Sequence, residues 1–288
     1  MNVSNLNKGG NVKVYSIKSS GLRKQISYSF DFAKRSDIDV TITLDSDDSM
    51  LKYDIKVNFH ETGNSEDGIP QLAFAMPFSY GSEKCRFDIP FGTVDREVYD
   101  FDVPANSFAA PIATVGDTGL MLISDSKYGF RYTENKLSLT LIRASYDPDP
   151  YPEYGVHYIR LGVGVCRIQE DNKELYKNAS KFIHPLPFCT ANLATRKGKL
   201  ALSKQFVDIE GNIKLSAVKP AEDSDGIVIR FYTPSKKTED YRLSFADKVK
   251  EVYYIDINET SFTSAELTNN SICGKCAPSQ IITVLIKF

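Results

Sequence analysis

The sequence has no tryptophan and only three histidines among its 288 residues, and no run of lysine and arginine stands out. Binding to nucleic acid or to an anionic membrane surface needs concentrated positive charge, whereas the formal net charge here is −2. No apolar run approaches the length of a membrane span. These absences argue against nucleic-acid and membrane partners. A content of 42% hydrophobic and 25% charged residues indicates an ordinary globular protein with a sizeable core.

Cysteine is present in an odd number, five, which does not indicate a disulfide framework in a chain of this length. Cys273 and Cys276 have the CxxC spacing of redox motifs. Such a motif needs a strand-to-helix setting, and we expect this one to lie in a polar loop before a C-terminal strand. A zinc site would need a second ligand pair at similar spacing, and there is none. We therefore expect neither a metal site nor a functional CxxC in this chain.

The first residues, MNVSNLNKGGNVK, are polar and unlike a signal peptide. This favours a cytoplasmic location. Without a secretion signal, the Asn-x-Ser/Thr sequences at Asn178, Asn258 and Asn269 carry little weight.

Period-two alternation of apolar and polar residues dominates the chain and predicts strands rich in Val, Ile, Tyr, Phe and Thr. The clearest runs are residues 39–44, 51–59, 137–142, 157–165, 226–232, 251–257 and 281–288. One amphipathic helix is expected over 172–183, with Leu175, Ala179 and Phe182 on one side. We predict an all-β fold, a large antiparallel β-sandwich or two stacked sub-sandwiches, with at most one short helix.

Known catalytic motifs are missing. His60 is followed by Glu61, but no second histidine stands four residues on, so the zinc-protease motif fails. No G-x-S-x-G, P-loop or G-x-G-x-x-G sequence occurs. His60, His157 and His184 are poor metal ligands unless the fold gathers them, and a lone histidine is more often structural.

The stretch LSLTLIRASYDPDPYPEYGVH, residues 137–157, joins a predicted strand to a proline-rich loop that carries Arg143, Asp147, Asp149, Glu153 and His157. Glycoside hydrolysis needs two carboxyl groups at a fixed separation, so these acids are candidates. The same Asp-Pro pattern also makes a good solvated turn. Because neighbours on one loop seldom face each other across a sugar ring, we favour the turn.

A family resemblance of the chain rests on several segments and on the order in which they follow one another. These segments are 51–61, 86–97, 102–111, 119–130, 139–150 with Gly155 and His157, 215–232, 257–259 and 281–288. Taken together, this ordered set resembles the C-terminal β-sandwich region of glycoside hydrolase family 38, the α-mannosidases. Glu153 stands where that family usually has an aspartate two residues before the loop glycine. The resemblance implies a galactose-mutarotase-like supersandwich fold.

The resemblance also implies where the chemistry lies. Family members hydrolyse α-mannosides with retention, using an Asp nucleophile, an acid carboxylate and a zinc ion, all held in an N-terminal α/β barrel and a helical segment. We expect residues 1–288 to be the C-terminal β-sandwich domain, with the catalytic domain outside this chain. No cofactor is then expected here, and zinc belongs to the missing catalytic domain.

On this hypothesis the chain is not catalytic alone, but packs on the barrel and walls the active site. Its partners would be the α-mannosidase catalytic domain and an α-mannoside or mannose-containing oligosaccharide. The candidates to face the sugar or the barrel are Asp147, Asp149, Glu153 and His157. Arg143 and Gly155 are candidates to brace the loop, and His157 is better suited to bracing than to proton transfer.

Two other hypotheses stay open. The chain could be an autonomous carbohydrate-binding module with Tyr146, Tyr151 and Tyr154 as its sugar platform. It could also be a complete enzyme of another family that uses Asp147, Asp149 and His157. The last hypothesis requires a deep pocket at the loop.

Overall fold

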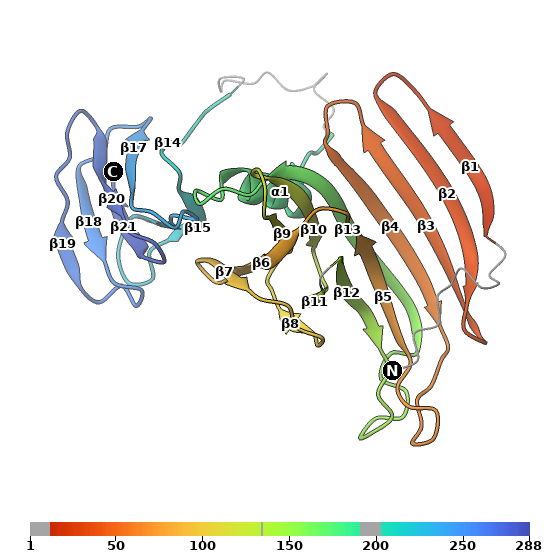
Figure 1. Ribbon diagram of the computed structural model, residues 1–288. Helices are drawn as coiled ribbons and strands as arrows, with labels where there is room; N and C mark the ends of the chain where they lie inside the picture. Colours follow the sequence, from red (N-terminus) through yellow and green to blue (C-terminus); the bar gives the residue numbers. More distant parts are fainter. Residues whose placement is uncertain (1–11, 134, 191–202) are drawn as a thin grey trace. The chain divides into compact units, whose positions relative to one another are not determined.

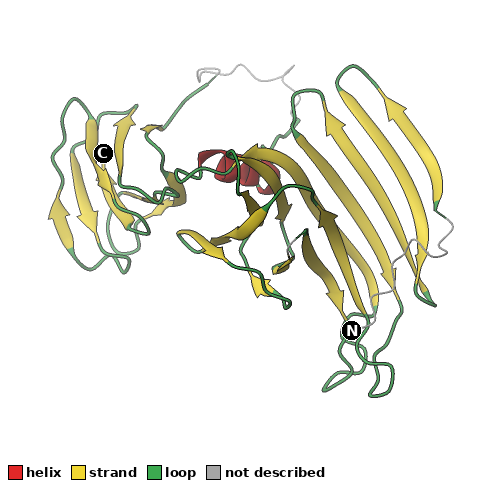
Figure 2. Cartoon of the chain, in the orientation of Figure 1, coloured by secondary structure: helices red, strands yellow, loops and turns green. Residues whose placement is uncertain are grey.

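A computed structural model describes residues 12–133, 135–190 and 203–288 (Figure 1). Its regular structure is almost entirely β-strand, and the described part holds a single helix, α1 (Lys173–Ile183) (Figure 2). The strands form four sheets, in which the registered neighbours are antiparallel. The predicted all-β fold with one short helix is confirmed. Residues 1–11, on which the expected location rests, lie outside the described residues.

The chain folds into two compact units. The first contains the described residues up to Asp88, together with Val94–Ile168 and Lys177–His184. The second contains Ile89–Thr93, Gln169–Tyr176 and the described residues from Pro185 to Phe288. In the described part, no helix is long and apolar enough to cross a membrane.

Two sheets build the first unit. The larger has nine strands in the order β1 (Lys13–Ser19), β2 (Arg23–Phe32), β3 (Ser36–Asp45), β4 (Met50–Phe59), β13 (Gly155–Arg167), β10 (Thr118–Ser124), β9 (Phe108–Ala113), β6 (Ser82–Ile89) and β7 (Gly92–Arg96). The smaller has four strands in the order β5 (Gln71–Pro77), β12 (Lys136–Arg143), β11 (Gly129–Thr133) and β8 (Val103–Pro104).

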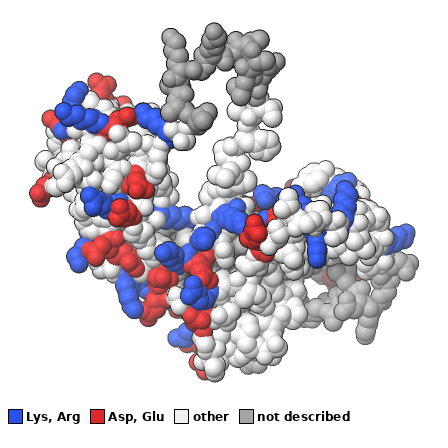
Figure 3. All heavy atoms as spheres, turned by 90° about the horizontal axis from the view of Figure 1, so that it is seen from above, with Lys and Arg blue, Asp and Glu red and all other residues white. Residues whose placement is uncertain are grey.

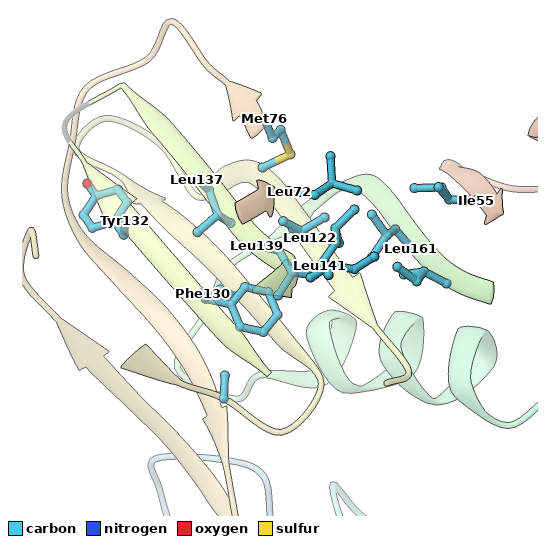
Figure 4. Close-up of a cluster of buried hydrophobic side chains, with 14 of the residues drawn as sticks. Ile55, Leu72, Met76, Leu122, Phe130, Tyr132, Leu137, Leu139, Leu141 and Leu161 are labelled. Carbon is cyan, nitrogen blue, oxygen red and sulfur yellow. The ribbon is translucent and has the colours of Figure 1, made fainter. Parts of the chain in front are cut away.

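The core of the first unit contains side chains from both of these sheets (Figure 4). Leu137 and Leu139 of β12 and Phe130 of β11 are fully buried together with Leu122 of β10 and Leu161 of β13. Burying one such side chain stabilises the fold by roughly 1.5–3 kcal/mol. Period-two alternation produces this layer, because every second residue of a strand points to the same face.

Helix α1 begins after Asp171, whose Oδ1 accepts a hydrogen bond from the backbone N–H of Lys173 at 3.1 Å. The three residues expected on its apolar side, Leu175, Ala179 and Phe182, are all buried. The ring of Phe182 lies against Gly162 of β13, where a Cβ atom would approach it to 3.2 Å. The predicted helix and its buried side are therefore confirmed.

The second unit is a smaller pair of sheets. One has the order β14 (Val207–Glu210), β17 (Glu239–Phe245) and β20 (Ser271–Cys276). The other has the order β15 (Lys214–Pro220), β16 (Ile227–Tyr232), β21 (Ile281–Lys287), β18 (Glu251–Ile255) and β19 (Phe262–Ser264). Its core includes Phe231, Leu243, Ile272 and Val284, each at most 1% exposed. All seven strands expected from the alternation are present, as β3, β4, β12, β13, β16, β18 and β21.

Charged side chains of both signs are interspersed on the face seen in Figure 3. Several charged side chains of the described residues form exposed ion pairs, such as Lys204 with Asp247 at 2.7 Å. Exposed pairs of this kind contribute only about 0–1 kcal/mol each, so the buried cores carry most of the stability.

Gly226, which precedes β16, offers a test of the second unit. Its φ is +142°, and a Cβ atom would lie 2.6 Å from the carbonyl oxygen of Ile286. We predict that Gly226→Ala lowers the free energy of unfolding by about 1–3 kcal/mol, because only glycine adopts such a backbone without strain. The midpoint of urea unfolding measures the change. Gly21→Ala, with no atom within 4 Å of the new Cβ, is the matched control; equal midpoints for the two variants would contradict the prediction.

Candidate functional site

The candidate site is a pair of neighbouring loops in the first unit, residues 60–70 after β4 and residues 144–154 before β13; we call them the tip loops. They are joined at their bases, where the backbone N–H of Ala144 donates to the carbonyl oxygen of Pro70 at 3.1 Å. Gly63 lets them approach, because a Cβ atom there would be only 3.0 Å from the Ala144 oxygen. The pairing of Gly155 with Phe59 then starts the long β13–β4 ladder.

Two of the three histidines contact the second tip loop. The Nε2 atom of His157 lies 2.8 Å from the backbone oxygen of Glu153, and its Nδ1 atom lies 3.8 Å from the Glu153 carboxylate. The ring of His60 packs edge-on against Tyr154, with centroids 4.6 Å apart. His184 lies elsewhere, at the end of α1. The fold therefore brings two histidines to the end of the loop, where they contact the neighbouring residues Glu153 and Tyr154.

The three carboxylates differ in what they contact. Asp147 is exposed and makes no hydrogen bond or ion pair with any described residue. The Oδ1 atom of Asp149 accepts a hydrogen bond from the backbone N–H of Tyr151 at 2.8 Å, a local turn. Glu153 is partly exposed and meets His157. Such a loop can present acceptor oxygens, but it does not bury a general acid.

The two expected bracing residues have different geometry. Gly155 has a φ of +134°, a backbone conformation in which other residues are strained, and this turns the loop into β13. Arg143 is exposed at the end of β12 and, among the described residues, has no hydrogen-bond or ion-pair partner. Their roles remain predictions, and geometry favours Gly155 and His157 over Arg143.

The loop tyrosines are exposed: Tyr146 by 39%, Tyr151 by 63% and Tyr154 by 54%. Tyr151 and Tyr154 stand nearly perpendicular, at 80°, with ring centroids 6.1 Å apart. They therefore offer separate ring faces rather than one flat platform.

A cavity of about 410 Å³ belongs to the second unit and is lined by Asp225, Gly226, Lys250, Glu251, Lys287 and Phe288. It is therefore not the deep pocket at the loop that the hypothesis of a complete enzyme requires.

No three His, Cys, Asp or Glu side chains within residues 12–133, 135–190 and 203–288 come together as a metal-binding group. His60 and His157 use their Nε2 atoms in hydrogen bonds, with Asn58 and with Glu153. The described residues thus provide no donor set for zinc.

Sequence reasoning missed the two anchors of the first tip loop. Glu61 Oε1 accepts hydrogen bonds from the backbone N–H groups of Lys34 and Arg35 and from the Ser36 hydroxyl, at 2.7–3.1 Å. His60 donates its backbone N–H to the same hydroxyl at 2.9 Å. The sequence signal for these anchors was the polar pair His60-Glu61 directly after a predicted strand. The partners of this pair are about 25 residues earlier in the chain and could not be identified from spacing.

The expectation that Cys273 and Cys276 lie in a polar loop is wrong, because both belong to strand β20. Residues three apart on a strand point to opposite faces, so Cys273 is exposed while Cys276 is buried. The polar Gly-Lys between them hid the strand from the sequence pattern. Gly274 is required there by packing, since a Cβ atom would lie 2.5 Å from the Tyr241 hydroxyl.

This arrangement predicts unequal thiol reactivity. Burial raises the pKa of Cys276, and raises that of Cys85 well above its ordinary value, so little of either thiol is ionised near neutral pH. We expect Cys189 and Cys273 to react with a disulfide reagent at pH 8 about tenfold or more faster than the buried thiols. Cys273→Ser should remove one fast-reacting thiol and Cys276→Ser none. A Cys273 that resists labelling until a reductant is added would contradict this assignment.

Comparison with known proteins places these features in a family. The profile of the glycosyl hydrolases family 38 C-terminal domain matches residues 2–151, and that of the family 38 C-terminal beta sandwich domain matches residues 212–284. Human alpha-mannosidase 2C1 is 23% identical over 282 residues, which cover 92% of this chain and 26% of that protein. Alpha-mannosidase G of Dictyostelium discoideum is 23% identical over 191 residues, covering 62% of this chain and 17% of that protein.

Solved structures agree on the fold. A family 38 glycosyl hydrolase from Enterococcus faecalis superposes with a TM-score of 0.78 at 16% identity, covering 98% of this chain and 37% of that chain. The chain thus spans about a quarter or less of these two curated relatives and little more than a third of the solved structure. Since the first profile matches 150 of its 288 residues, the chain belongs to the glycosyl hydrolases family 38 C-terminal domain family.

Proposed function

We propose that this chain is the non-catalytic C-terminal part of an α-mannosidase. In that protein it packs on the catalytic domain, and its 144–154 loop forms part of the wall of the active site. The observation that carries the proposal is the family 38 match over both units, together with similarity to 17% and 26% of the length of two relatives named alpha-mannosidases. The reaction would be hydrolysis of terminal α-mannosides by the whole protein.

The composition and exposure of the loop support its part in this proposal. Asp147 and Asp149 expose carboxylate oxygens, which accept hydrogen bonds from sugar hydroxyls or from donors on a neighbouring domain. Both are exposed on the loop, where such donors can reach them. Their proposed task is therefore to bind and orient rather than to transfer protons.

Zinc, which the family resemblance implies, would bind in the catalytic domain and grip hydroxyls of the sugar there. The described residues of this chain contribute no three-donor group to it. The chain's own contribution is the shape and polarity of the pocket wall.

We expect the chain alone to show no turnover of an aryl α-mannoside in the presence of zinc, with an intact family 38 α-mannosidase as the positive control. Adding the catalytic portion of such an enzyme, prepared without its own C-terminal region, should produce a complex detectable by size-exclusion chromatography. Robust turnover by the chain alone would refute the proposal.

In that complex, Asp147→Asn combined with Asp149→Asn should raise KM by roughly tenfold, the expected loss for one hydrogen bond to a charged group. Asp223→Asn, an exposed turn residue of the second unit, is the matched control and should leave KM unchanged. If the loop variant and the control behave alike, the loop does not face the substrate.

The exposed rings of Tyr151 and Tyr154 favour a second function, an autonomous carbohydrate-binding module. Calorimetric titration of the chain with mannosides and mannan separates the two proposals. Binding that is lost in Tyr151→Ala would support the module, and the absence of heat would remove it.

A further inference from the structure

The hydrogen bonds of His157 determine which ring nitrogen carries a proton. A backbone carbonyl oxygen only accepts, so the Nε2 atom that lies 2.8 Å from the oxygen of Glu153 must carry hydrogen. In the neutral ring, Nδ1 is then a bare lone pair, and it lies 3.8 Å from the Glu153 carboxylate. Protonating Nδ1 replaces this unfavourable pairing by an ion pair.

The same reasoning assigns the position of the hydrogen on His60. The side-chain amide nitrogen of Asn58 donates to the Asp37 carboxylate at 3.0 Å, so the amide oxygen of Asn58 faces His60 and His60 Nε2 carries the hydrogen. The Nδ1 atom of His60 is buried and has no partner among the described residues.

The charged groups near the two rings leave Glu153 as the ion-pair partner of His157 in the described part of the chain. On β4, the residues opposite and beside His157 are Val57 and Phe59, which carry no charge. Glu61, next to His60, is occupied by the 34–36 turn, and Asp37 by Asn58.

We propose that His157 and Glu153 form a pH-dependent clasp on the 144–154 loop. The ion pair exists only where the imidazole of His157 is protonated and the carboxylate of Glu153 is ionised. When the ring is neutral, only its Nε2–H bond to the loop remains; when the ring is protonated, the bond and the ion pair hold the loop together. The importance of the clasp rests on the proposed function, because it would hold the wall of the sugar site most firmly in mildly acidic solution.

Hydrogen–deuterium exchange of the loop amides in the full chain tests the clasp. Exchange is compared between the unmodified chain and His157→Gln, which keeps a side-chain N–H donor but cannot be charged, at pH 5.5 and pH 7.5. Taking the ratio at each pH cancels the intrinsic effect of pH on exchange. An exposed ion pair gives about a two- to fivefold effect, so the variant should exchange about two- to fivefold faster at pH 5.5, with a smaller ratio at pH 7.5.

When the comparison is repeated in chains that carry Glu153→Gln, the ratio of exchange rates with and without His157→Gln should no longer depend on pH. Glu153 is a partly exposed loop residue, so we expect this variant to keep the fold. His184→Gln, at the exposed end of α1, is the matched control and should exchange like the unmodified chain at both values. An equal ratio at both pH values, or a pH dependence that survives Glu153→Gln, overturns the clasp. No mannoside or partner domain is present, so this result is independent of the experiments on the proposed function.

Discussion

Strands β4 and β13 pair over ten residues, from Gly155 opposite Phe59 to Gly164 opposite Met50. Both strands are buried on one face through Ile55, Val57, Ile159 and Leu161. A slip by one residue would turn these side chains out of the core, at roughly 1.5–3 kcal/mol for each, so burial specifies the register strongly. The tip loops depend on this constraint. They meet because β4 ends at the position opposite the start of β13.

The register also determines which loop residues can act together. His157 is the third residue of β13 and is opposite Val57, so its ring is held by the sheet while its nitrogens reach the loop. His60 follows the last residue of β4 and meets the loop from the other strand. Residues at two neighbouring strand ends thus contact one proline-rich segment. Binding residues on loops that a scaffold positions in this way are common.

The seven clearest strands and the helix could be predicted because one buried face imposes a period that local sequence displays. β20 could not be placed, since Gly274 and Lys275 interrupt its alternation and the need for that glycine comes from Tyr241, more than thirty residues earlier. The polar, proline-rich composition of the loop could be recognised in residues 143–157. The contact of the loop with His60 could not be predicted, because it is created by strand pairing across the sheet rather than by spacing along the chain.

The loop acids differ in whether their carboxylates already have partners. Glu153 is tied to His157, and Asp149 to its own turn, while the Asp147 carboxylate has no partner in the described part of the chain. An acid that is already paired with a histidine is less available to a new donor than an unpaired acid is. Only Asp147 and Asp149 fall inside the family match that ends at residue 151, whereas Glu153 and His157 lie beyond it. The part of the loop within the match therefore carries the acids proposed for contact, and the part that follows carries the residues proposed to hold it.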